Sequence, residues 1–292
     1  MAQFLISAFA DEAAPTLQGQ IDALKRNGLA YIEPRSIEGN VIQKTEEELY
    51  EIAKGLAENG IAVSSLGSPI GKFDIEKPLE EHLPDFERAL RACEILGTKR
   101  MRIFSFFVPQ EQLAEKREEV LRRMRILLEL AEQRGITLCH ENESKIYGQN
   151  PDEVADLLTS LPALRGIFDA ANYVMNDQDP LRGFEATLPS LAYLHVKDAR
   201  FAEKCIVPCG MGDGQYEEIL RRVDRATDQT LFLTVEPHLH IFQAYARIDS
   251  HKLKTGLAFD NSDDAFDCAV NHLKQTLAKL GFHEEENKLW KK

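Results

Sequence analysis

The sequence predicts a (β/α)8 TIM barrel, an α/β fold, formed as a single domain. Three observations favour it: eight apolar runs of strand length, amphipathic segments of helical length between them, and a length of 292 residues that suits one large domain. A doubly wound sheet would usually have fewer strands and a glycine-rich phosphate turn, and no G-x-G-x-x-G or Walker A motif is present. We place the barrel at residues 1–282 and a charged C-terminal tail at residues 283–292.

The expected strands are short apolar runs separated by segments long enough to hold a helix. They are Phe4–Phe9, Ala30–Pro34, Ala62–Leu66, Met101–Phe106, Ile136–His140, Gly166–Phe168, Leu191–Val196 and Leu231–Val235. In such barrels the chemistry takes place at the carboxyl ends of the strands. The polar residues that follow each run are therefore the first candidates for a functional site.

The clearest expected helices have apolar residues at helical spacing and a nearby glycine that can cap the C-terminal end. They are Leu17–Lys25, Glu46–Glu58, Glu111–Gln133 and Asp263–Leu280. The glycine-rich segment 210–214 follows a loop rather than a strand, so we interpret it as a turn before the seventh helix. The charged tail is interpreted as a frayed terminus or an oligomer contact.

The composition is that of an ordinary soluble protein, with 43% hydrophobic and 28% charged residues. The longest apolar stretches have about seven residues, whereas a membrane-spanning helix needs about 20, and the first residues do not resemble a signal peptide. We expect a cytoplasmic protein with no membrane partner. The net charge of −13 argues against nucleic-acid binding, and five cysteines without C-x-x-C spacing predict neither a disulfide framework nor a four-cysteine zinc site.

Four successive strands end in side chains that can bind a metal ion. In chain order these are Glu141, Asp169, His195 and Glu236. A single carboxylate at a strand end is more often a helix cap, but four such residues at one rim favour a metal site. Three carboxylates and an imidazole suit Mn²⁺, Mg²⁺ or Co²⁺ and tolerate Zn²⁺ or Fe²⁺.

The segments around these residues resemble the metal-binding strand ends of the xylose-isomerase-like superfamily of sugar isomerases and epimerases. They are Leu138–Asn142, Ile167–Asn172, Leu194–Asp198 and Thr234–Pro237. Two further segments, Ser7–Glu12 and Ser65–Gly71, resemble bacterial sugar phosphate isomerases and epimerases. The resemblance extends over residues 3–282 and includes the order and spacing of the four candidate ligands.

The resemblance implies that the four residues bind one divalent metal ion, Mn²⁺ first, with Mg²⁺, Co²⁺ or Zn²⁺ as alternatives. From the ketose 3-epimerases it also implies that Glu141 and Glu236 are the catalytic pair, which moves a proton on opposite faces of the substrate. The expected substrate is a small carbohydrate: a sugar, a sugar phosphate or a keto-polyol. A metal-chelated carbonyl acidifies the neighbouring C–H, so that an enediolate can form. The resemblance further suggests a homo-oligomer, either a dimer or a tetramer.

The chain departs from many relatives at the sixth strand, where Asn172 replaces the histidine of an Asp-x-x-His pattern. Asparagine is a poor metal ligand but a good partner for a hydroxyl, so we expect Asn172 to bind substrate and not a second metal. This argues against an apurinic-site endonuclease or phosphoesterase of the superfamily, which stays open as the alternative. A keto-polyol dehydratase and a barrel that binds metal or sugar without turnover also stay open.

The strand that carries His195, together with the loop after it, contributes two further candidates for substrate binding. Lys197 lies two residues beyond His195 on the same face of the strand, where its ammonium could hold a substrate oxygen unless it pairs with Asp198. Arg200 lies in the next loop, where the epimerases that the chain resembles use an arginine against substrate hydroxyls.

Arg35 and Arg102, on the second and fourth strands, could bind a phosphate or a carboxylate through paired hydrogen bonds. Either could instead be a solvated or barrel-internal charge, and Glu33 could pair with one of them. Ser68, in one of the resembling segments, completes the expected substrate-binding set.

Three histidines near these residues are not expected to bind metal. His140 precedes Glu141, so on an extended strand its side chain faces away, toward the surrounding helices. His238 and His240 lie in the stretch 238–259, which lacks clear periodicity and which we interpret as a lid or a partner contact.

Overall fold

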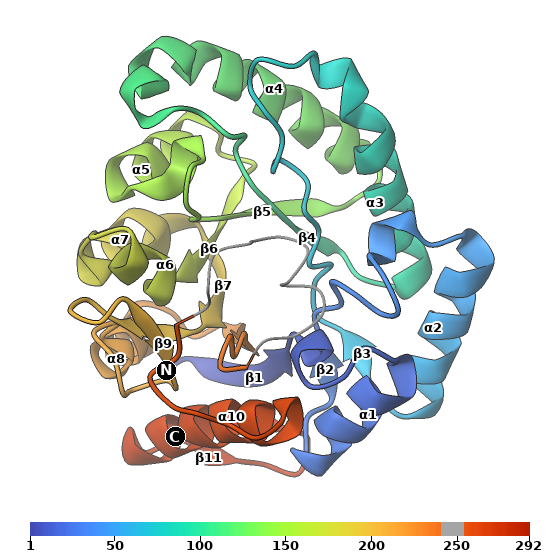
Figure 1. Ribbon diagram of the computed structural model, residues 1–292, viewed down its shortest axis with the longest axis vertical. Helices are drawn as coiled ribbons and strands as arrows, with labels where there is room; N and C mark the ends of the chain where they lie inside the picture. The colour runs from blue at the N-terminus through green and yellow to red at the C-terminus, as the bar shows by residue number, and fades with distance from the viewer. Residues whose placement is uncertain (241–253) are drawn as a thin grey trace.

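Eight parallel strands form a barrel with helices around it (Figure 1). The computed structural model describes residues 1–240 and 254–292, so most of the stretch interpreted as a lid or partner contact, residues 241–253, lies outside the described ranges. The barrel strands are β1 Gln3–Ala8, β2 Tyr31–Ile32, β3 Ala62–Val63, β4 Arg100–Ile103, β5 Thr137–Glu141, β6 Arg165–Asp169, β7 Leu191–Val196 and β10 Thr230–Val235. The predicted fold class is confirmed.

The barrel closes through backbone hydrogen bonds between neighbouring strands. Parallel pairings run without a break from β4 through β5, β6, β7 and β10 to β1. The short strands β2 and β3 pair with each other. The residues after β2 join β1, where Glu33 donates its N–H to the carbonyl of Ala8 (3.0 Å). The residues after β3 join β4, where Leu66 donates its N–H to the carbonyl of Arg100 (3.0 Å). All eight carboxyl ends therefore meet at one rim.

The helices bury their apolar faces against the outside of the strands. They are α1 Leu17–Arg26, α2 Glu46–Glu58, α3 Leu83–Leu96, α4 Leu113–Gln133, α5 Pro151–Ser160, α6 Ala170–Met175, α7 Pro180–Thr187, α8 Tyr216–Ala226 and α10 Ser262–Lys279. Short 3₁₀ turns are η1 Ala10–Glu12, η2 Val41–Gln43, η3 Leu79–Glu81, η4 Gln110–Gln112, η5 Tyr147–Gln149 and η6 Leu188–Ser190. Helix α2 has the predicted bounds, and α4 begins later than predicted because η4 precedes it. All five cysteines are free, and within the described ranges no helix has the length and apolar character needed to cross a membrane.

The C-terminal tail forms a hairpin, so the expectation of a frayed terminus is wrong. Strand β11, His283–Glu284, pairs antiparallel with β12, Leu289–Lys291, and β12 pairs antiparallel with β1. Because β2 is short and meets β1 only at its carboxyl end, the edge of β1 around Phe4 and Leu5 is left for β12. The Trp290 side chain is buried there, which fixes the hairpin.

A second hairpin, absent from the predicted elements, follows β7. It consists of β8, Asp198–Arg200, and β9, Cys205–Val207. The Asp198 carboxylate accepts the backbone N–H groups of Gly210, Gly212 and Gly214 at 3.0, 3.0 and 2.9 Å. A Cβ at Gly212 would lie 2.4 Å from the Asp198 Oδ1, so this close approach requires glycine. The glycine-rich segment is thus the predicted turn before α8.

His140 is buried on the outer side of β5. Its Nε2 lies 2.9 Å from the Ser105 hydroxyl, which also accepts the N–H of Gly148 at 3.0 Å. These contacts agree with the structural role predicted for His140. Burial lowers the pKa of His140 to about 4, so the imidazole is neutral in the folded protein at pH values where it is charged in the unfolded chain.

We expect His140 to make folding sensitive to acid between pH 6.5 and pH 4. Below its unfolded pKa of about 6.5 only the unfolded chain binds the proton, so at pH 5 the cost is about 2 kcal/mol. Urea unfolding at pH 7.5 and pH 5 should show that His140→Gln loses less stability on acidification than the unmutated protein. The exposed His283→Gln is the control and should leave the difference unchanged. An unaltered difference in His140→Gln would contradict the prediction.

Candidate metal and catalytic site

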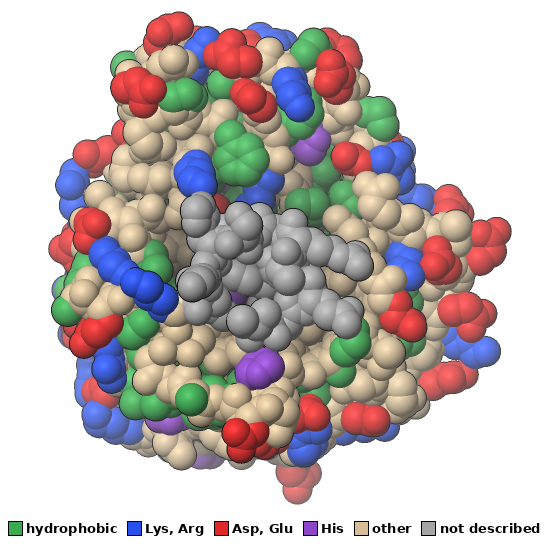
Figure 2. All heavy atoms as spheres, viewed as in Figure 1, with side chains coloured by type: hydrophobic (Ala, Val, Ile, Leu, Met, Phe, Trp, Pro, Cys, Tyr) green, Lys and Arg blue, Asp and Glu red, His purple; other side chains and the backbone are tan. Residues whose placement is uncertain are grey.

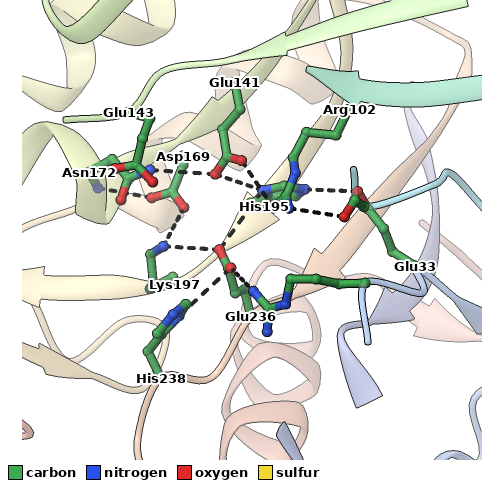
Figure 3. Close-up of polar contacts among 12 residues, drawn as sticks. Glu33, Arg102, Glu141, Glu143, Asp169, Asn172, His195, Lys197, Glu236 and His238 are labelled. Atoms are coloured by element: carbon green, nitrogen blue, oxygen red, sulfur yellow. Dashed lines mark hydrogen bonds and ion pairs between the residues drawn. The ribbon is translucent and has the colours of Figure 1, made fainter. Parts of the chain in front are cut away.

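The four strand-end residues meet at one rim of the barrel. Potential ligand atoms of Glu141, Asp169, His195 and Glu236 all lie within 4.8 Å of one another, and all four side chains are buried (Figure 3). Glu141 and Asp169 end β5 and β6, His195 lies near the end of β7, and Glu236 directly follows β10. The sequence therefore predicted which residues lie together, although they are up to 95 positions apart.

The His195 ring presents a different nitrogen to each side. Its Nδ1 lies 3.0 Å from the Glu141 Oε1 and 3.9 Å from the Glu236 Oε2. Its Nε2 lies 3.4 Å from the Oε1 of Glu33, inside the barrel. Nδ1 is thus the nitrogen that faces the carboxylate cluster and could hold a metal ion.

Asp169 uses its two carboxylate oxygens separately. Oδ1 accepts the N–H of Asn172 at 2.9 Å and caps α6, while Oδ2 lies 3.1 Å from the Lys197 Nζ. The Asn142 side chain holds the backbone of Asp169, donating to its carbonyl (2.9 Å) and accepting its N–H (3.0 Å). The helix-cap and cluster roles are therefore compatible. Sequence reasoning missed Asn142, although it belongs to the resembling segment at the end of β5.

Glu236 is held between two cations. Its Oε1 accepts from the Arg35 guanidinium at 2.8 Å, and its Oε2 accepts from the Lys197 Nζ at 2.9 Å. Lys197 therefore pairs with Glu236 and Asp169 rather than with Asp198. Arg35 also pairs with Asp11 at 3.0 Å and Glu12 at 3.2 Å.

Glu141 is similarly held by an arginine. The Arg102 Nη1 lies 3.3 Å from its Oε2, and the same guanidinium donates to the carbonyls of Gly67 and Ser68. The Ser68 hydroxyl donates to the Arg102 carbonyl at 2.5 Å. Ser68 was expected to bind substrate, but its hydroxyl is engaged in holding the strand that carries Arg102.

Of the other residues considered from the sequence, some lie beside the carboxylate cluster and some do not. The Asn172 amide donates to the Asn142 carbonyl at 2.8 Å and lies 3.4 Å from the Glu141 Oε1, so it borders the cluster. Arg200 lies in the β8–β9 hairpin and donates to the Met211 carbonyl at 3.2 Å; within residues 1–240 and 254–292 no hydrogen bond or ion pair joins it to the cluster. His238, expected not to bind metal, forms a second compact group with Glu12 and Glu236.

Negative charge is in excess at this rim. Six buried carboxyl groups face four buried or nearly buried positive groups; the carboxyl groups are Asp11, Glu12, Glu33, Glu141, Asp169 and Glu236, and the positive groups are Arg35, Arg102, Lys197 and His195. Burial opposes the charge on His195, but the neighbouring Glu141 and Glu33 outweigh it and raise the pKa of His195 to about 10. Burial raises the pKa of Asp169 to about 7, against the opposing charge of Lys197. Burial also raises the pKa of Glu12 to about 8, against Arg35. An oxygen-rich donor set with uncompensated negative charge fits a divalent cation.

The two proposed catalytic carboxylates remain ionised. Burial would raise the pKa of Glu141, but His195 and Arg102 outweigh it and lower the pKa to about 2. Burial is likewise outweighed at Glu236, mainly by Lys197, and its pKa lies well below the usual range. On the face in Figure 2, acidic and basic side chains both occur around the outline of the molecule.

Residues 21–259 match the model of the family described as xylose isomerase-like TIM barrel. The chain belongs to this family. The resemblance inferred from the strand-end segments is confirmed, and the match includes all four residues of the cluster. No curated protein matches the chain.

Solved structures of the xylose isomerase-like barrel type share the fold at low identity. The IOLI protein with a bound zinc atom superposes with a TM-score of 0.74 at 14% identity, covering 94% of this chain and 99% of that chain. The probable 3-DHS dehydratase AsbF from Bacillus anthracis has a TM-score of 0.71 at 15% identity, covering 92% and 98%. D-Psicose 3-epimerase with D-tagatose, from Clostridium cellulolyticum H10, has a TM-score of 0.66 at 13% identity, covering 94% and 99%.

We expect Asp169→Asn to stabilise the protein when metal is absent. Because the folded pKa is about 7 and the unfolded pKa is about 4, the charged carboxylate destabilises the fold as pH rises from 4 to 7. Asparagine keeps an oxygen to cap α6. In chelator, urea unfolding at pH 8 should show a gain of up to about 4 kcal/mol that disappears near pH 4.

The exposed Asp228→Asn is the matched control and should show no such gain. A lower stability of Asp169→Asn at both pH values would contradict the prediction.

Proposed function

We propose that this protein is a metal-dependent isomerase or epimerase of a small sugar, sugar phosphate or keto-polyol. The observation that carries the proposal is the placement of Glu141 and Glu236. They come from β5 and from the residue after β10, approach the same nitrogen of His195, and are each held by an arginine. Two ionised carboxylates on either side of one small site suit proton removal and proton return.

A divalent ion held by Glu141, Asp169, His195 and Glu236 would polarise a substrate carbonyl and acidify the neighbouring C–H. One glutamate then takes the proton from carbon, and the other returns a proton from the far side, which inverts that carbon. Return to the adjacent carbon would instead interconvert an aldose and a ketose. The Lys197 ammonium can donate to an oxygen on which negative charge develops, and the Asn172 amide can donate to a hydroxyl.

The comparisons support the proposal at the level of the fold. D-Psicose 3-epimerase and the probable dehydratase AsbF share the barrel, and loss of water from a keto-polyol can begin with the same proton removal. A nuclease function has less support, because the chain carries a net charge of −13 and Asn172 stands where a further histidine ligand would be needed.

Solvent deuterium exchange tests the proposal directly. Metal-loaded protein in deuterated water should remove a carbinol proton signal from one member of a panel of free and phosphorylated ketoses, as followed by proton NMR. Glu141→Gln and Glu236→Gln should lower the rate by about 10²- to 10⁴-fold, because each removes a proton-transfer group.

The position of exchange identifies the reaction. Exchange at the carbon whose configuration changes indicates an epimerase, and a new vinylic signal indicates a dehydratase. Equal exchange by Glu236→Gln and the unmutated protein would exclude the proposed role of Glu236.

Metal stoichiometry gives an independent prediction. Calorimetric titration of chelator-treated protein with Mn²⁺ should show one ion per chain. Asp169→Asn should lower the affinity about a hundredfold or more, because it replaces one of the four expected ligands, a carboxylate, with a neutral amide. Asp228→Asn should bind as the unmutated protein does. Two or three zinc ions per chain, with phosphodiester cleavage, would favour the nuclease instead.

A further inference from the structure

Glu33 is a buried carboxylate that the proposed chemistry does not use. It follows β2 and is fully buried inside the barrel. Its Oε1 accepts from the Tyr193 hydroxyl at 2.8 Å and lies 3.4 Å from the His195 Nε2, whereas Oε2 has no hydrogen-bond partner among the described residues. A buried carboxylate with an unsatisfied oxygen destabilises a fold, so its packing role alone does not account for it.

The position of Glu33 is set by elements on different sides of the barrel. Tyr193 and His195 lie two residues apart on β7, so both side chains point to the same face. The Tyr193 hydroxyl also lies 3.0 Å from the Ser65 Oγ, which continues the hydrogen-bonded series to the residues after β3. Figure 3 shows Glu33 on the opposite side of the His195 ring from Glu141, Asp169 and Glu236.

A cation at Nδ1 requires the ring proton on Nε2, the side of Glu33. In the metal-free site Nδ1 lies within hydrogen-bonding distance of the Glu141 Oε1, whereas Nε2 has its 3.4 Å ion-pair contact with Glu33 and makes no hydrogen bond among the described residues. An imidazole that binds a metal ion is neutral, with one N–H and one lone pair. With the proton on Nε2, the N–H points to Glu33 and the Nδ1 lone pair points into the carboxylate cluster. With the proton on Nδ1, the lone pair would face Glu33, and the N–H would occupy the side where a cation is expected.

We propose that Glu33 is a positioning residue that holds His195 in its Nε2–H tautomer and ring orientation, so that Nδ1 is available as a metal ligand. The inference rests on the metal site of the proposed function. Carboxylates that accept the second N–H of a ligating histidine orient the ring and raise the basicity of the ligand in metal sites generally. Glu33 had been expected to pair with Arg35 or Arg102, and its place beside His195 came only from the fold.

Metal affinity and NMR test the proposal without an activity assay. In the calorimetric titration with Mn²⁺, Glu33→Leu should lower the affinity about 10- to 100-fold, whereas Glu33→Gln, whose amide oxygen can still accept the N–H, should recover most of it. Ser65→Ala, which removes a hydroxyl that contacts Tyr193 and leaves both contacts of the Glu33 Oε1 in place, is the matched control and should stay close to the unmutated affinity.

With Zn²⁺ bound and histidine labelled with ¹⁵N, the unmutated protein should give one His195 signal set with the proton on Nε2, assigned by its absence in His195→Gln. Glu33→Leu should broaden or replace that set, while its metal-free thermal midpoint stays the same or rises. A merely structural role would instead lower the midpoint and leave the tautomer unchanged.

Unaltered metal affinity and an unaltered His195 tautomer in Glu33→Leu would overturn the inference while leaving the proposed function intact. Loss of affinity in Glu33→Leu together with no deuterium exchange by the unmutated protein would support the inference and reject the isomerase or epimerase. Absence of metal binding by the unmutated protein would overturn both.

Discussion

Excess negative charge buried at one rim of the barrel is the constraint on which the site depends. Each cation there is shared between carboxylates: Lys197 lies between Glu236 and Asp169, and Arg35 pairs with Asp11, Glu12 and Glu236. Such an arrangement is costly in a protein interior unless further positive charge offsets it. The high pKa of Asp169 expresses that cost, and a divalent ion would remove it. The same imbalance therefore lowers stability and is the basis of the proposed cation site.

The barrel holds these groups through contacts to backbone as well as to side chains. Asn142 fixes the backbone of Asp169, Ser68 holds the strand segment of Arg102, and the Asp198 carboxylate gathers the glycine-rich turn after β9. Each contact joins neighbouring strand ends or the loops that follow them. The carboxylates consequently cannot move apart to relieve their repulsion without breaking hydrogen bonds of the barrel rim.

Two glutamates with similar surroundings occupy this rim. Glu141 and Glu236 each contact an arginine with one oxygen and face His195 with the other. This near-equivalence suits a reaction in which one carboxylate takes a proton and the other returns it. Lys197 breaks the equivalence, because it contacts Glu236 and not Glu141. In the proposed reaction the two glutamates would therefore differ in the direction of proton transfer that they favour.

The sequence by itself determined the eight barrel strands, the barrel and the four residues that meet at its rim. These follow from local periodicity and from the rule that parallel barrel strands end together. The tertiary structure alone decided which side chains contact one another. It pairs Lys197 with Glu236 rather than Asp198, and it places Glu33 beside His195. It also engages Ser68 with the strand of Arg102 and places Arg200 away from the cluster. It also placed the charged tail as a hairpin on β1. Such pairings depend on strand register and ring orientation across the closed barrel, which involve residues up to 286 positions apart and leave no local pattern in the chain.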